Sequence, residues 1–522
     1  MSQPESENRS VKWSRRELFQ AGGVATAWSL LGSSSAVAKA GNGQNLFTRI
    51  GVRPFINLTA TYTINGGALS RPEVKQAMEE ASHYPVNIDE LMEKAGERLA
   101  QLLGCESGII TSGCSAALTH ATAACVAGSD PEKMLQLPNL RGLKDQVIMP
   151  KQSRNVYDHA IRTVGVTLVE VDSREEFYAA LGERTAMIAV LGTAEAKGSV
   201  RLEELVAAGH KAGVPVLVDA AAELPLVPHP YLSRGADLVG HSGGKFLRGP
   251  QCAGMLLGRR DLVQAAWLNG APHHAFGRAM KVGKEEIMGM LAAIEVWRHN
   301  YDLEAEYKKW EGWYGEIGRA IMKVPGIQVK VVPPAGASPF PVLEVAWDPQ
   351  QLGVTAGEVG RQLRDGEPRI FSHAEGDGHS FIIRPVALKE GEHTIVADRL
   401  LEIFRQAPKG TMPRPLRPPT AQLSGSWELK IEFSRGAVAH QWLLEANGNQ
   451  ITGRHFGRIT KGSVTGTIDG EKLLLRSSLP YEGTRLAYDF TGLAASGEMS
   501  GEVSLGEYGR ARWTARRRVT EA

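Results

Sequence analysis

Short apolar runs alternate with longer stretches of helical spacing through the first half of the chain. The apolar runs are rich in β-branched residues and span residues 109–111, 146–150, 167–171, 187–191 and 214–219. Continuous apolar runs are typical of strands buried on both faces. Strand and helix in alternation predict a mainly parallel sheet with right-handed crossovers. We therefore expect an α/β large domain over residues 46–300.

A second, smaller α/β domain is predicted over residues 301–406. One long helical stretch over residues 285–322 leads into alternating strands near 327–332 and 341–345. The strand that ends at Arg384 comes next, and a last helix begins near residue 391.

The pattern changes after a Pro-rich linker over residues 407–420. Trp427, Leu429 and Ile431 alternate with charged residues, as in a half-buried strand, and Asn447-Gly448 predicts a hairpin turn. Residues 421–522 are therefore expected to form a small antiparallel β-barrel or sandwich. Packing or oligomer contacts are its default role, and ligand binding is the alternative.

The first 40 residues have the three parts of a twin-arginine signal peptide. Arg15-Arg16 precedes an apolar run over residues 21–31, and small-residue cleavage options come after it near residue 38. The alternative is a disordered basic tail. The signal predicts a protein that the twin-arginine export machinery carries in folded form to the periplasm or beyond, and that is soluble once the signal is removed.

Charge argues against a nucleic-acid partner. The 522 residues carry a formal charge of +2, and residues 1–40 contribute five basic and three acidic residues. The mature chain is therefore neutral, without the basic excess typical of nucleic-acid binding. The four cysteines lack metal-site spacing, and no metal is expected.

The candidate nucleophile is Lys245 in the sequence Ser242-Gly243-Gly244-Lys245, which comes directly after an apolar run. A lysine in a tight, partly desolvated pocket forms Schiff bases with carbonyls. The alternative is a surface lysine at the end of a Gly-rich turn.

Two further motifs come earlier in the chain. Asp219 ends the apolar run 214–219, and ligands gather beyond the carboxyl ends of parallel strands. Ser112, Gly113, Cys114 and Ser115 join a strand to an Ala-rich helix, where backbone N–H groups bind phosphate. The alternatives are an N-cap aspartate and an ordinary strand-to-helix turn.

In this order the motifs resemble those of the fold-type I pyridoxal phosphate enzymes, in the branch that contains selenocysteine synthases and D-glucosaminate-6-phosphate ammonia lyases. The resemblance covers about residues 46–405. Its motifs are Arg53-Pro54-Phe55-Ile56-Asn57, Ser112-Gly113-Cys114, Val218-Asp219, Ser242-Gly243-Gly244-Lys245 with Arg248-Gly249-Pro250-Gln251, and residues 278–286.

The resemblance implies a fold-type I large and small domain and assigns roles to these residues. Lys245 would carry pyridoxal 5'-phosphate, and Asp219 would hold its pyridinium nitrogen. The turn Ser112, Gly113, Cys114 and Ser115, together with Ser242, would hold the phosphate. Candidate substrate-binding residues are Arg154, Arg278, Lys281 and Arg384. Related sequences often have a histidine near Ser153, which this chain lacks.

The resemblance also implies a reaction and an assembly. The expected reaction is α-proton abstraction and β-elimination from a small-molecule amino acid, giving a 2-oxo acid and ammonia. Alternatives are a β-replacement transferase, a racemase, an aminotransferase, and, in another class, a cofactor-free binding protein that uses its β-domain. A homodimer or larger homo-oligomer is expected. Export and neutral charge disfavour a tRNA substrate.

Overall fold

The computed structural model describes residues 45–336, 338–374, 378–408, 415–495 and 497–518. The predicted signal peptide and the middle of the Pro-rich linker lie outside the described residues. Residues 45–55 belong to a first unit and contain the short 3-10 helix η3 (Thr48–Ile50). The second unit begins at Ile56 and contains both α/β domains and the C-terminal region.

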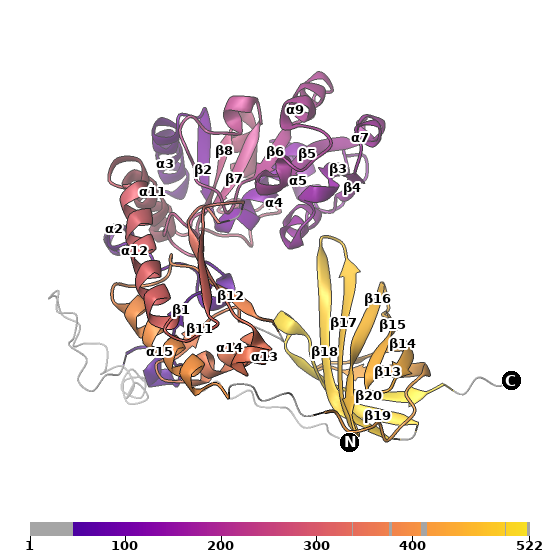
Figure 1. The fold of residues 1–522 in the computed structure, drawn as a ribbon. Coiled ribbons are helices and arrows are strands. Elements are labelled where there is room, and N and C mark those ends of the chain that lie inside the picture. The colour runs from indigo at the N-terminus through magenta and orange to yellow at the C-terminus, as the bar shows by residue number, and fades with distance from the viewer. Residues whose placement is uncertain (1–44, 337, 375–377, 409–414, 496, 519–522) are drawn as a thin grey trace, which may run out of the picture. The chain divides into compact units, whose positions relative to one another are not determined.

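A seven-stranded mixed sheet forms the large domain (Figure 1). Its strands lie in the order β2 (Ser107–Thr111), β8 (Gly254–Gly258), β7 (Leu238–Ser242), β6 (Val216–Asp219), β5 (Thr185–Leu191), β3 (Gln146–Pro150) and β4 (Thr167–Val171). Within this sheet only β8 runs against its neighbours. The predicted, mainly parallel α/β sheet is confirmed.

Helices bury this sheet on both faces. Along β5, Met187 and Ala189 belong to one hydrophobic cluster, and Ile188 and Val190 belong to another. Such alternation places the two clusters on opposite faces of the sheet. The helices of the domain are α2 (Pro72–Ser82), α3 (Ile88–Leu103), α4 (Gly113–Ala127), α5 (Pro131–Gln136), α6 (His159–Arg162), α7 (Arg174–Ala180), α8 (Gly192–Glu195), α9 (Leu202–Lys211), α10 (Arg260–Leu268) and α11 (Lys284–His299).

The small domain combines a three-stranded antiparallel sheet, a two-stranded parallel one and four helices. The strand order is β12 (Ser380–Ile383), β10 (Val342–Ala346), β9 (Gln328–Val332), and β1 (Ile56–Asn57) pairs with β11 (Ile370–Phe371). The helices are α12 (Leu303–Ile321), α13 (Pro349–Leu352), α14 (Ala356–Asp365) and α15 (Glu392–Gln406).

The prediction of one continuous helix over residues 285–322 is wrong. Helix α11 ends at His299, and α12 begins at Leu303. The Asp302 side chain accepts a hydrogen bond from the Ala305 N–H at 2.9 Å, which caps the second helix. Hydrophobic spacing alone hides this short interruption.

The C-terminal region is a closed antiparallel barrel (Figure 1). Of the two predicted folds, the barrel is therefore confirmed and the sandwich is wrong. Each strand pairs with the next, and the last pairs with the first. The strands are β13 (Gly425–Glu432), β14 (Ala437–Asn447), β15 (Gln450–Phe456), β16 (Lys461–Asp469), β17 (Lys472–Tyr481), β18 (Thr484–Ala495), β19 (Glu498–Ser504) and β20 (Arg510–Arg517). The β14–β15 turn consists of Gly448 and Asn449, one residue later than predicted.

Aromatic side chains fill the barrel interior. Trp427, Trp442, Trp513 and Phe490 are all buried, and the Trp442 ring lies 4.8 Å from Phe490 and 5.4 Å from Trp513. Small barrels filled in this way are packed cores. Packing is therefore the role that the interior favours over ligand binding.

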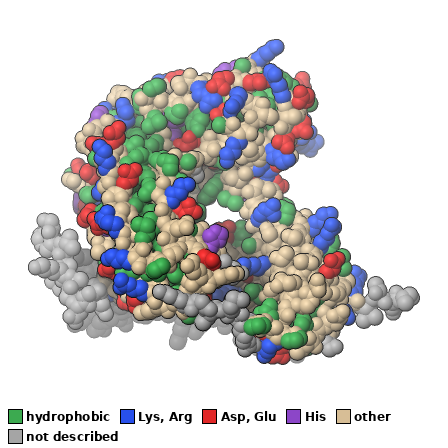
Figure 2. All heavy atoms as spheres, in the orientation of Figure 1, with side chains coloured by type: hydrophobic (Ala, Val, Ile, Leu, Met, Phe, Trp, Pro, Cys, Tyr) green, Lys and Arg blue, Asp and Glu red, His purple; other side chains and the backbone are tan. Residues whose placement is uncertain are grey.

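Two surface features bear on what the molecule contacts. Over the face drawn in Figure 2, lysine and arginine side chains are interspersed with aspartate and glutamate side chains on the large domain. Within the described ranges, no helix combines the length and the apolar character needed to cross a membrane.

Candidate active site

Lys245 lines a cavity of about 140 Å³. It lies after β7 in the chain and is partly buried. The other lining residues come from several segments: Thr61, Thr63, Ser112, Gly113, Cys114, Ser115, Leu118, Tyr157, Asp219, Ala221, Ser242, Gly244 and Gln251. The predicted lysine, aspartate and strand-to-helix turn thus meet at one cavity.

Strand register explains why these residues meet. Gly254 of β8 pairs with Thr111 of β2 on one side and with Ser242 of β7 on the other. A β-carbon at Gly254 would lie 2.5 Å from the carbonyl carbon of Gly113. Only glycine lets the turn after β2 pack this closely against the strand that leads to Lys245.

Asp219 is the last residue of β6, and it is buried. Its Oδ1 accepts a hydrogen bond from the Ala221 N–H at 3.0 Å and a weak one from the Cys114 thiol at 3.7 Å. Burial raises the pKa of Asp219, while the Ala221 N–H and the positive charge of Lys245 act against this rise. A cationic partner is therefore the group that this carboxylate is suited to hold.

The turn into α4 is suited to an anion. Gly113 starts this 15-residue helix, and the N-terminal end of the helix, with its free backbone N–H groups, lines the cavity. Ser112 makes no side-chain cap, and its hydroxyl donates to the Met280 carbonyl at 3.1 Å. The Cys114 side chain is directed to Asp219, so any part it has in holding an anion is through its backbone.

These residues fit pyridoxal phosphate. The set provides an amine for the aldehyde, a buried carboxylate for the pyridinium and a helix N-terminus for the phosphate. Gln251 lines the cavity, and its Oε1 atom is buried and has no hydrogen-bond partner among the described residues. A buried acceptor without a partner favours a bound group with a donor to offer.

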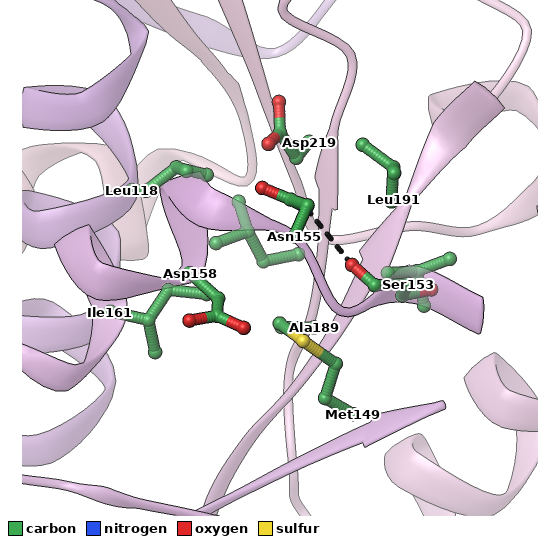
Figure 3. Close-up of a pocket in the computed structure, with 11 residues that line it drawn as sticks. Leu118, Met149, Ser153, Asn155, Asp158, Ile161, Ala189, Leu191 and Asp219 are labelled. Carbon is green, nitrogen blue, oxygen red and sulfur yellow. Dashed lines mark hydrogen bonds between the residues drawn. The ribbon is translucent and has the colours of Figure 1, made fainter. Parts of the chain in front are cut away.

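A second, much smaller cavity adjoins Asp219 (Figure 3). It has about 10 Å³, room for about one water molecule. Ser153, Asn155 and Asp158 line it, and the Ser153 hydroxyl is buried without a partner among the described residues. Asp219 thus lies between the Lys245 cavity and the loop that carries residues 153–158.

Sequence reasoning missed Tyr157, which lies in the 3-10 helix η6 (Val156–Asp158). Its ring centroid is 5.8 Å from the Lys245 Nζ atom. The available signal was its place shortly after Ser153, near which related sequences often have a histidine. Thr61 and Thr63 were also missed, because nothing local marks them, and Gln251 belongs to a motif of the resemblance but was given no role.

Arg154 is engaged by three carboxylates of the chain itself. Its guanidinium donates to Asp158 at 2.7 Å, to Glu170 at 3.2 Å and to Glu482 at 2.5 Å. Its predicted role in substrate binding stays a prediction, and these contacts compete with it.

The other three predicted substrate residues do not line the Lys245 cavity. Arg278 and Lys281 are exposed before α11. Arg384 comes directly after β12, and its N–H donates to the Leu58 carbonyl at 3.0 Å, beside the segment that carries Thr61 and Thr63. Their roles stay predictions. Among the described residues, no three His, Cys, Asp or Glu side chains are grouped to hold a metal.

Comparison with known proteins identifies the relatives of this chain. The Aminotransferase class-V family model matches residues 70–280. D-glucosaminate-6-phosphate ammonia lyase of Salmonella typhimurium is 30% identical over 375 residues, which span 70% of this chain and 99% of that protein. A solved structure of a D-glucosaminate-6-phosphate ammonia-lyase matches with a TM-score of 0.62 and 29% identity, again covering 70% of this chain and 99% of the other.

Two further relatives carry different names. The 5'-C-glycyluridine monooxygenase-decarboxylase of a Streptomyces species is 31% identical, over 62% of this chain and 83% of its own. The L-seryl-tRNA(Sec) selenium transferase of Moorella thermoacetica is 25% identical, over 66% of this chain and 80% of its own. With the geometry of the Lys245 cavity, these matches show that the chain belongs to the fold-type I pyridoxal phosphate-dependent enzymes, in the branch of D-glucosaminate-6-phosphate ammonia lyase and the selenocysteine synthases.

Proposed function

We propose that this enzyme is a lyase that converts an amino acid into a 2-oxo acid and ammonia by β-elimination. The main support is the relative that this chain covers almost from end to end, which is an ammonia lyase. The residues of the cavity supply the groups that such a reaction needs.

Lys245 has two tasks in this proposal. Its amine would hold the cofactor in the cavity, and it would be free to act as a base once the substrate is bound. The freed Nζ atom then takes the proton from the substrate α-carbon, as a general base. When bound, pyridoxal phosphate withdraws the electrons that this proton leaves behind.

Asp219 and the α4 N-terminus support these steps. The Asp219 carboxylate keeps the ring nitrogen protonated, and the backbone around Ser112 and Ser242 holds the phosphate. Loss of the β-substituent leaves an unsaturated amino acid, which water hydrolyses to the 2-oxo acid and ammonia. We assign the substrate carboxylate to Arg384, and anionic groups further out to Arg278 and Lys281.

The second candidate is a β-replacement transferase, favoured by the similarity to selenium transferases. Both reactions share proton removal and loss of the β-substituent. They differ in the next step, because the transferase adds a second nucleophile before release. Racemisation and transamination remain the further alternatives.

A substrate screen tests the proposal. Purified, cofactor-loaded protein is incubated with L- and D-amino acids that carry β-hydroxyl groups, including sugar amino acids. We expect equal amounts of ammonia and 2-oxo acid, because elimination and hydrolysis release both from each turnover. Product that appears only when a thiol or another nucleophile is added would identify the transferase, and inverted substrate without ammonia would identify a racemase.

We also propose that the mature enzyme is exported and forms a homodimer or larger homo-oligomer. The twin-arginine motif at Arg15-Arg16, the apolar run over residues 21–31 and the small residues near residue 38 support export. Cell fractionation would locate the processed protein in the periplasm, and light scattering would give at least twice the mass of the chain. Processed protein that stays in the cytoplasm, or a monomeric holoenzyme, would contradict the corresponding half of this proposal.

A further inference from the structure

The turn between β17 and β18 of the barrel contacts the loop beside the active site. The Arg154 Nη2 atom donates to the Glu482 Oε2 atom at 2.5 Å, and the Arg154 side chain is only 12% exposed. A β-carbon at Gly483 would lie 2.2 Å from the Asn155 carbonyl oxygen and 2.6 Å from the Asp158 Oδ2 atom. The turn therefore lies directly on residues 154–158.

The two turn residues stand in an order that the hairpin itself does not favour. Tyr481 pairs with Thr484, so Glu482 and Gly483 form a two-residue turn. Glu482 has a φ of 48°, in the left-handed region where a β-carbon is strained and glycine is preferred. The glycine stands instead at the second position, whose φ is not in that region.

Contact with the large domain accounts for both choices. At the first position, the glutamate supplies the carboxylate that pairs with Arg154. At the second position, the missing β-carbon lets the backbone approach Asn155 and Asp158. Glu482 and Gly483 therefore suit the contact with the large domain better than they suit the hairpin turn.

In the contacted loop, Tyr157 is flanked by two residues that make hydrogen bonds, Asn155 and Asp158. The Asn155 Oδ1 atom accepts a hydrogen bond from the Tyr157 N–H at 2.7 Å. The Asp158 carboxylate is fully buried and accepts from Arg154 at 2.7 Å and from Arg162 at 3.1 Å. Tyr157 thus lies between two residues that the barrel turn touches, and its ring lies 5.8 Å from the Lys245 Nζ atom.

A second barrel residue acts on the same tyrosine. Burial raises the pKa of the Tyr157 phenol, and Tyr62, Asp219 and Glu507 add to the rise. Glu507 belongs to the 3-10 helix η8 (Gly506–Tyr508), between β19 and β20. The electrostatic surroundings of Tyr157 therefore include the barrel.

We propose that the Glu482-Gly483 turn is a positioning element that holds residues 154–158 and thereby keeps Tyr157 over Lys245. The barrel, for which the sequence predicts packing or oligomer contacts with ligand binding as the alternative, would then act on the active site of its own chain. The inference rests on Lys245 as the cofactor lysine and not on the identity of the substrate.

Hydrogen exchange of the full-length holoenzyme tests this inference, with Glu482→Gly as the main variant. Glycine suits the first turn position, so the barrel should unfold at an unchanged or higher temperature. Loss of the carboxylate should nevertheless speed exchange in peptides covering residues 154–162 about tenfold, the effect of one charged hydrogen bond. We also expect a changed circular dichroism signal of the bound cofactor, since the Tyr157 ring lies 5.8 Å from the Lys245 Nζ atom that would hold it.

Two further variants calibrate the result. Glu482→Gln keeps a hydrogen-bond acceptor without the charge, so its effect should be intermediate. Glu498→Gln is the matched control, because Glu498 also flanks a barrel turn and pairs with an arginine, Arg516, at 3.4 Å. It should leave exchange in residues 154–162 unchanged.

Unchanged exchange in residues 154–162 of the Glu482→Gly variant would overturn the inference. Faster exchange throughout the barrel strands would also overturn it, because the effect would then be unfolding of the barrel. Neither readout uses a substrate. A failed search for ammonia release would therefore count against the proposed reaction and leave this test intact.

Discussion

Replacing Lys245 with alanine is expected to abolish covalent cofactor binding and to lower turnover by at least about 10³-fold. The variant loses both the amine that bonds to the cofactor aldehyde and the base that removes the α-proton. The fold should persist, because Lys245 is only partly buried and lies at a cavity wall. Borohydride reduction and subsequent peptide mapping measure the bond directly.

Lys309→Ala is the matched control for this experiment. Lys309 is more exposed than Lys245, pairs with Glu306 at 2.7 Å and lies over the Trp313 ring, and it belongs to α12 of the small domain. Its variant should keep the reducible cofactor and full turnover. A reduced adduct on any other lysine, or turnover retained by the Lys245 variant, would remove Lys245 from the mechanism.

Replacing Asp219 with asparagine is expected to lower turnover by about 10²–10³-fold while the protein stays folded. The amide keeps an oxygen for the Ala221 N–H, but it loses the negative charge that holds the pyridinium. Because burial raises the pKa of Asp219, its charge is a cost to the cofactor-free fold at neutral pH. Cofactor-free Asp219→Asn protein should therefore unfold at an equal or higher temperature than the wild type.

Asp237→Asn is the control that separates the effect of losing any buried carboxylate from the effect of losing the carboxylate of Asp219. Asp237 is equally buried, but it accepts from the Val216 N–H at 2.8 Å and from Arg259 at 2.9 Å, at the start of β7. Its variant should lower the unfolding temperature, since it leaves Arg259 without its full partner, and should keep the cofactor absorbance. If Asp219→Asn kept the wild-type turnover, the carboxylate would have no part in holding the cofactor.

Local patterns were enough to predict the α/β scaffold. They also indicated the residues that we propose to bind the cofactor, and the structure places these residues at one cavity. Asp219 ends one apolar run and Ser112 directly follows another. The ends of these strands could therefore be predicted without knowing which strands pair. Parallel topology then brings such ends to one edge of the sheet. Lys245 stood out because small residues surround a cation that would otherwise favour the surface.

The rest depends on contacts that leave no local mark. Nothing near Arg154 in the sequence indicates Glu482. This glutamate accepts a hydrogen bond from the Arg154 guanidinium although it lies 328 positions away in the chain. Tyr157 looks like any loop tyrosine until the fold brings it near Lys245. The break between α11 and α12 depends on one side-chain cap at Asp302, which hydrophobic spacing does not record.

The distance along the chain between Arg154 and Glu482 also sets an order in time. A ribosome adds about 5–20 residues per second, so roughly 16–66 s separate the synthesis of the two partners. Within that interval, once β8 has been made, the large domain has all its strands, but the loop with Tyr157 still lacks the barrel turn that contacts it. The proposed contact therefore forms only after the last hairpins of the barrel have been made and have closed.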